Sequence, residues 1–183
     1  MPTGASPPIP PFIVLGLGNL LLQDDGVGLS ILEALRDKAP QSMPGRLSDQ
    51  VEMMDGGTQG ISLLGRIEGR RGLLILDAIR LGDPPGTLHI FEGADLPSIL
   101  PPSATSGHEG NCGDLMRAAM LLGSLPPRIA LVGLEPEVIR TGMGLSPQVR
   151  TAVPEAAEAA ASILASWLPC AGEPAPPASD PER

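Results

Sequence analysis

The chain has 183 residues, of which 42% are hydrophobic and 2% aromatic, and its formal net charge is −9. This length allows one domain with a substantial core. The acidic balance, the scattered basic residues and the scarcity of aromatic rings exclude the usual nucleic-acid binders, which use basic surfaces or stacking platforms. No apolar run approaches the roughly 18 residues of a membrane span, and no leader pattern precedes the first strand. We therefore expect a cytoplasmic protein that binds neither nucleic acid nor membrane.

Both ends of the chain lack a periodic apolar pattern. Residues 1–11 and 169–183 are rich in proline and small residues, so we expect two disordered tails around a single domain at 12–168. Within it, short apolar runs predict five strands, at 12–16, 50–55, 72–79, 86–93 and 128–135. Helical spacing predicts helices at 28–37, 58–67, 113–125 and 146–168, with Pro154 either kinking the last helix or beginning its second part.

The order of these elements predicts the fold class. Strands and helices alternate, which is typical of an α/β protein with a mostly parallel sheet. The connection between strands 72–79 and 86–93 is shorter than the dozen or so residues that a parallel crossover needs. Strand 86–93 should therefore be antiparallel and lie at an edge. We predict an α/β three-layer sandwich: a twisted five-stranded sheet, mostly parallel with one antiparallel edge strand, and helices on both faces.

The loop after the first strand, LGLGNLLLQDDGVG (15–28), raises the question of its ligand. Its Gly-x-Gly start suggests a nucleotide loop, but a dinucleotide fingerprint needs a third glycine or alanine where this chain has Leu21. The paired acids Asp24 and Asp25 would also repel phosphate. We therefore expect no organic cofactor, and we interpret the loop as a turn that presents a carboxylate. One of the two aspartates, more plausibly Asp24, is expected to cap the following helix or support the loop.

Two further polar residues fall where an α/β sheet binds ligands. Asp77 follows the apolar run Leu73 to Leu76, and a carboxylate there is costly unless it is paired, capped or bound to a cation. The carboxyl ends of the first and third strands should bring Asp25 and Asp77 to one crevice. His108 lies in the glycine-rich stretch TSGHEGNCGD just before a predicted helix. Two carboxylates and one imidazole form a plausible site for a borderline metal ion.

The chain resembles the [NiFe]-hydrogenase maturation endopeptidases, which trim the C-terminus of the hydrogenase large-subunit precursor. The matching blocks occur in the family's order and cover nearly all of the chain between the tails. They are VLGLGNLLLQDDGVG (14–28), DGGTQG (55–60), LLILDAI (73–79), SGHEGNCGDL (106–115) and LVGLEPEVIRTGMGLSPQV (131–149). The first and last blocks are the most specific.

The resemblance implies a peptidase domain at 12–168 and a metal-binding cleft lined by Asp25, Asp77 and His108, which we take as both the metal ligands and the catalytic residues. It implies that the enzyme recognises nickel already inserted in the precursor and removes a C-terminal extension, the final step of maturation. A non-catalytic, nickel-dependent escort of the precursor would need the same cleft and remains the alternative.

One segment departs from the family pattern. Relatives often have His-x-x-Gly-Leu after the histidine, whereas this chain has His108 followed by Glu-Gly-Asn-Cys, and this change leaves the shape of the histidine loop open. A cysteine protease using Cys112 with His108 is a further alternative, although Cys112 is more simply a small packing residue.

Overall fold

A computed structural model describes residues 9–42, 49–93, 96 and 112–168 of the chain. The predicted elements are present there, with shifted ends. The strands are β1 (Phe12–Leu17), β2 (Val51–Gly57), β3 (Gly72–Ala78), β4 (Leu88–Glu92) and β5 (Arg128–Leu134). The α-helices are α1 (Val27–Ser42), α2 (Leu64–Ile67), α4 (Cys112–Leu121) and α5 (Pro147–Trp167). Two short 3-10 helices, η1 (Asp24–Gly26) and η2 (Gly60–Leu63), precede α1 and α2.

The five strands form one sheet in the order β2-β1-β3-β5-β4. Strands β2, β1, β3 and β5 are parallel, whereas β4 pairs with β5 in the antiparallel direction and lies at the edge. This confirms the predicted fold class, including the antiparallel edge strand. Strand β3 is central and buried over its whole length. In the register of the sheet, Asp77 of β3 lies opposite Gly133 of β5, and Gly133 lies opposite His89 of β4.

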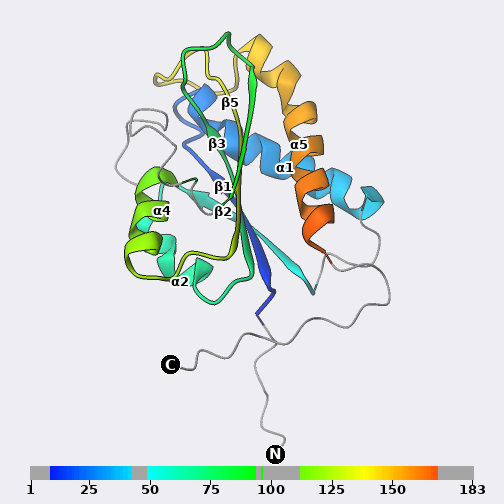
Figure 1. Cartoon of the computed structure of the whole chain (residues 1–183). Coiled ribbons are helices and arrows are strands. Elements are labelled where there is room, and N and C mark those ends of the chain that lie inside the picture. The colour runs from blue at the N-terminus through cyan, green and yellow to red at the C-terminus, as the bar shows by residue number, and fades with distance from the viewer. Residues whose placement is uncertain (1–8, 43–48, 94–95, 97–111, 169–183) are drawn as a thin grey trace, which may run out of the picture.

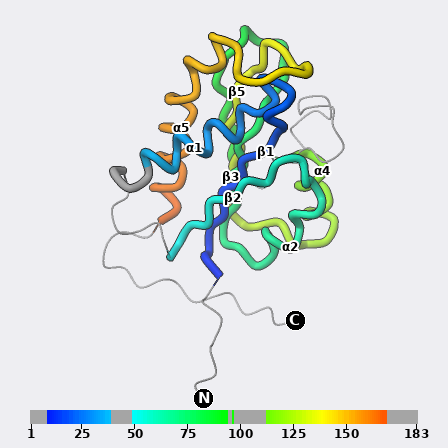
Figure 2. The backbone as a smooth tube through the Cα atoms, turned by 180° about the vertical axis from the view of Figure 1, so that it is seen from behind, coloured from blue at the N-terminus to red at the C-terminus, as the bar shows by residue number. Residues whose placement is uncertain are grey.

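Helices cover both faces of the sheet, as Figures 1 and 2 show from opposite sides. Alternate strand residues point to opposite faces, so each face has its own apolar core. One core joins Val14, Leu76 and Val132 to helices α1 and α5. The other joins Leu15, Ile75 and Leu131 to α2 and α4. The small aromatic content is therefore offset by aliphatic side chains packed on both faces of a buried sheet.

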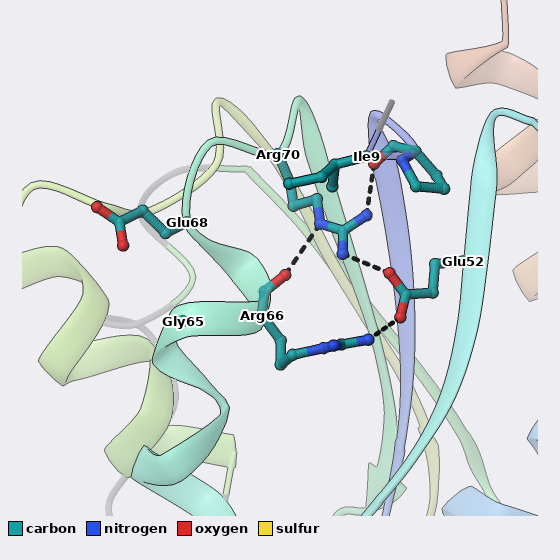
Figure 3. Close-up of a pocket in the computed structure, with 7 residues that line it drawn as sticks. Ile9, Glu52, Gly65, Arg66, Glu68 and Arg70 are labelled. Carbon is teal, nitrogen blue, oxygen red and sulfur yellow. Dashed lines mark hydrogen bonds and ion pairs between the residues drawn. The ribbon is translucent and has the colours of Figure 1, made fainter. Parts of the chain in front are cut away.

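The starts of the parallel strands are fastened by a buried arginine. The Arg70 guanidinium forms an ion pair with Glu52 and donates hydrogen bonds to the carbonyls of Pro10 and Arg66, at 2.5 and 2.9 Å (Figure 3). Arg66 forms a second ion pair with Glu52. These groups line a pocket of about 250 Å³ at the end of the sheet opposite the carboxyl ends of the parallel strands. No residue predicted for the functional site lines it.

Two sequence predictions about helices need correction. The segment predicted as a helix at 58–67 is divided into η2 and the four-residue α2, in keeping with its glycines, which weaken a helix. Helix α5 is continuous with Pro154 inside it, so Pro154 does not begin a second helical part. Within the described part of the chain, no helix is long and apolar enough to cross a membrane. The predicted tails fall almost wholly outside the described residues.

Candidate metal-binding and catalytic site

The loop after β1 turns back on itself through glycines. Gly18 has a φ of 121°, and a Cβ atom there would lie 1.9 Å from the carbonyl oxygen of Asp25, so only glycine fits. Gly28, in the first turn of α1, lies so close to the ends of β1 and β3 that a Cβ would approach the Leu76 and Leu17 carbonyl oxygens to 2.2 and 2.4 Å. The loop is therefore pressed against the carboxyl ends of the two central strands.

Asp24 is a structural residue of this loop. It is fully buried, and its carboxylate accepts hydrogen bonds from the amides of Glu137 and Val138, both at 3.0 Å, and from the amide of Ser146 at 2.6 Å. All three donors belong to the segment between β5 and α5. The support role expected for Asp24 is confirmed, but it supports that distant segment, and the helix-capping interpretation is wrong because none of these bonds goes to α1.

Asp25, the next residue, is buried to 1% exposure but is only partly satisfied. Its Oδ2 accepts a hydrogen bond of 3.0 Å from the amide of Asn19, whose own side chain closes the turn by accepting the amide of Leu21 at 2.9 Å. Its Oδ1 is buried without a hydrogen-bond partner in the described residues. A carboxylate oxygen in this state is costly, because burial removes water and nothing replaces it.

Asp77 repeats this pattern at the end of β3. Its Oδ1 accepts the amide of Ala78 at 2.8 Å, and its Oδ2 has no partner among the described residues. The pKa of this carboxyl is raised to about 7, mainly by burial; the negative charge of Asp25 contributes to the rise, and hydrogen bonds from Cys112 and Ala78 partly offset it. The Cys112 thiol lies beside the carboxyl and is only a weak hydrogen-bond donor.

Asp25 and Asp77 thus approach each other at the carboxyl ends of adjacent strands, as their positions in the sequence predicted. Each has one buried oxygen without a partner among the described residues, and the charge of Asp25 acts on Asp77. Two such carboxylates are stabilised by a proton or a cation. The third predicted ligand, His108, lies outside the described residues. Cys112, four residues after it, is the first residue of α4 and contacts Asp77.

The surroundings of Cys112 argue against the cysteine-protease alternative. The residue is fully buried in the core between the sheet, α2 and α4. Burial and the neighbouring Asp77 charge raise the pKa of its thiol well above the ordinary value. A nucleophilic cysteine needs the opposite, a lowered pKa in an electropositive and accessible place. Cys112 is a packing residue that contacts the candidate site.

A group that the sequence analysis missed lies at the same end of the sheet. Glu135 directly follows β5, as Asp77 ends the apolar part of β3, and this parallel was the available signal. It accepts the amides of Leu81 and Gly82 at 2.8 and 3.1 Å and contacts His89 at 3.2 Å. His89 belongs to β4 and is 8% exposed, and nothing in its strand sequence distinguished it from a surface residue.

Comparison with known proteins agrees with this geometry. Residues 34–163 match a family model described as hydrogenase maturation protease. The hydrogenase expression/formation protein HupD of Rhizobium leguminosarum bv. viciae is 36% identical over 162 residues, which cover 88% of this chain and 77% of the relative. The hydrogenase 2 maturation protease of Escherichia coli K12 is 35% identical over 153 residues, covering 83% of this chain and 89% of the relative.

Solved structures give the same answer. The hydrogenase maturating endopeptidase HybD from Escherichia coli superposes with a TM-score of 0.72 at 35% identity, covering 86% of this chain and 94% of that one. The [NiFe] hydrogenase maturation protease HybD from Thermococcus kodakarensis gives a TM-score of 0.64 at 27% identity, covering 83% and 97%. The chain therefore belongs to the hydrogenase maturation proteases, a family of endopeptidases.

Proposed function

We propose that this protein removes the C-terminal extension of a nickel-loaded [NiFe]-hydrogenase large-subunit precursor in the cytoplasm, as the final step of the precursor's maturation. Membership in the maturation protease family supports the reaction class. The observation that carries the site is the pair of buried oxygens without partners, Asp25 Oδ1 and Asp77 Oδ2. Nickel enters this proposal as part of the substrate and is not a resident cofactor.

The two carboxylates suit a divalent cation for electrostatic reasons. Each is buried to 1% exposure, and the charge of Asp25 raises the pKa of Asp77. A cation between them would remove the repulsion and supply the missing partner of both oxygens. Carboxylate oxygens with an imidazole nitrogen are suitable ligands for a borderline ion such as Ni²⁺. His108 supplies that nitrogen in the proposal, since four residues of chain span at most about 14 Å from Cys112 beside Asp77.

Two chemistries can then cleave the peptide bond. Nickel held by the precursor and by this site would orient the C-terminal segment and polarise its carbonyl group. Alternatively, the ionised Asp77 carboxylate takes a proton from a water molecule as the water oxygen attacks the scissile carbonyl carbon, a role for which a pKa of about 7 is well placed near neutral pH. In both, Asp25 and Asp77 act on the substrate directly, and Asp24 only holds the surrounding loops in place.

The test is cleavage of a purified precursor, followed by intact-mass spectrometry. The wild-type chain should release a C-terminal peptide from nickel-loaded precursor and leave nickel-free precursor intact. Asp25→Asn and His108→Ala should each slow release by about 100-fold or more, whereas the matched surface variant Asp37→Asn should not. Asp37 is an exposed acid of α1. Wild-type rates in both site variants would overturn the site, and equal cleavage of nickel-free precursor would overturn the role of nickel.

The same measurement separates the two alternatives. An escort would bind nickel-loaded precursor without any loss of mass, whereas an endopeptidase changes the mass by that of the released peptide. Cys112→Ser should retain cleavage, because the buried thiol is not the nucleophile in this proposal. Loss of cleavage in a folded Cys112→Ser variant would return the cysteine mechanism to consideration.

A further inference from the structure

A second group of metal-ligating side chains lies at the carboxyl end of the sheet, on the other side of β5. Asp83 comes from the β3–β4 connection, His89 from β4, and Glu135 from the residue after β5. We infer that these three side chains form a second site that binds one divalent first-row transition-metal ion. The candidate site at Asp25 and Asp77 does not include them, and the inference does not depend on the proposed function.

The spacing of the three groups suits one ion. His89 Nε2 lies 3.2 Å from Glu135 Oε2 and 3.9 Å from Asp83 Oδ2, and one ligand atom from each residue lies within 4.8 Å of the others. Nitrogen and oxygen ligands at about 2.0–2.2 Å from a tetrahedral ion are about 3.3–3.5 Å apart. Small side-chain rotations of the exposed Asp83 therefore bring all three ligand atoms into range.

The two inner ligands are already held in position. Glu135 is 3% exposed, and the amides of Leu81 and Gly82 fix its carboxylate at 2.8 and 3.1 Å. Backbone hydrogen bonds from Gly86 to the Glu135 carbonyl and from the Glu135 amide to Thr87 close the same loop. Such outer contacts orient ligands and strengthen metal binding. The Asp83 side chain is 52% exposed, so an ion can arrive from solvent on that side.

A single hydrogen bond does not join all three groups. Donation from His89 Nε2 to Glu135 explains the 3.2 Å contact, but it leaves Asp83 at 3.9 Å, beyond hydrogen-bond range. With a neutral imidazole the group carries two negative charges around one nitrogen lone pair. A dication satisfies the two carboxylates and the nitrogen together, and one imidazole with two carboxylates is a ligand set that Zn²⁺ and Ni²⁺ accept.

The second group is distinct from Asp25 and Asp77, whose carboxylates do not belong to the cluster of ligand atoms. Gly133 lies between Asp77 and His89 in the register, so these two residues are two strands apart, or roughly 10 Å. The buried Ile79 side chain fills the space over Gly133, since a Cβ there would lie 2.5 Å from Ile79 Cδ1. The two groups can therefore be tested separately.

The test uses the fact that the chain has two histidines, His89 and His108. In a His108→Ala variant labelled with ¹⁵N, His89 is the sole imidazole, and Zn²⁺ added to the full-length protein should shift its Nε2 resonance with saturation near one equivalent. Adding Asp83→Asn should weaken this binding about tenfold or more, whereas adding the matched surface variant Glu92→Gln should not. Adding Asp25→Asn should leave the His89 shift unchanged.

Each outcome decides the inference. Asp83 is the chosen ligand variant because its side chain is half exposed, so its loss should not unfold the protein, unlike loss of Glu135 with its two loop amides. An unchanged His89 resonance at a several-fold excess of Zn²⁺ would overturn the site. So would a shift that Asp25→Asn abolishes, or one that Asp83→Asn leaves at wild-type affinity. Failure of the precursor-cleavage experiment would not affect any of these readings.

Discussion

Replacing Asp77 by asparagine should make the protein more stable at alkaline pH while it removes a candidate metal ligand. The folded protein raises the pKa of this carboxyl from 3.8 to about 7, mainly by burial. Between these values, the native state keeps a proton that the unfolded chain has lost. The stability of the wild type therefore falls as the pH rises through this window, and the full penalty is present above pH 7. Asparagine has no proton to lose.

The size of the effect follows from the two pKa values. Each unit of difference corresponds to about 1.4 kcal/mol. Between pH 5 and the native pKa of about 7, the wild type loses stability over about two pH units, and above this pKa the loss levels off. The difference in the free energy of unfolding between Asp77→Asn and the wild type should therefore grow by about 3 kcal/mol from pH 5 to pH 8. Asparagine also keeps an oxygen that can accept the Ala78 amide, which holds Asp77 Oδ1 at 2.8 Å. The contributions of titrating groups that do not interact with Asp77 cancel in the difference between variant and wild type.

Urea denaturation followed by far-ultraviolet circular dichroism at pH 5, 6, 7 and 8 measures this difference directly. The matched control is Glu155→Gln, an exposed acid of α5, whose difference from the wild type should stay flat. A difference for Asp77→Asn that changes by less than about 0.5 kcal/mol over this range would refute the reasoning. It would mean that Asp77 ionises normally in the folded protein and that its free oxygen is solvated or paired.

Two further predictions concern the loop after β1. Asp24→Ala should lower the free energy of unfolding by about 3 kcal/mol or more, because three amides between β5 and α5 lose their acceptor. The control Asp37→Ala replaces an exposed acid of α1 and should change the free energy of unfolding little. Equal effects of the two variants in urea denaturation would contradict the structural role of Asp24. Leu21→Glu should slow precursor cleavage about tenfold or more, because this 62% exposed apolar side chain lies on the loop that carries Asp25 and is available to contact the precursor. The control is Leu121→Glu, 88% exposed at the far end of α4; unchanged cleavage in Leu21→Glu would show that the precursor does not contact this loop.

The fold was predictable because its signals are local. The strands β1, β3 and β5 are continuous apolar runs, and a short connection alone predicted that β4 is antiparallel and at the edge. Long-range features were not accessible in this way. Nothing in the sequence fixes the strand order, and no local pattern marked where the helix predicted at 58–67 divides into η2 and α2.

The candidate site was predictable only in part. The position of Asp77 after a buried strand and that of Asp25 in a glycine-rich loop placed both at the carboxyl ends of neighbouring strands. The role of Asp24 depends on amides more than a hundred residues away, which no local pattern can reveal. The contact of His89 with Glu135 is of the same kind, since it crosses from one strand to the end of its neighbour.

The two adjacent aspartates explain how this loop combines stability with a reactive site. Asp24 and Asp25 are equally buried, yet three amides satisfy the first, while one amide leaves an oxygen of the second bare. The close approach of Gly28 to the ends of β1 and β3 leaves no room for a side chain there and keeps the start of α1 next to the sheet. A fixed, unsatisfied carboxylate beside a second one costs free energy during folding. A proton on Asp77, or a cation shared by both carboxylates and bound after folding, offsets this cost.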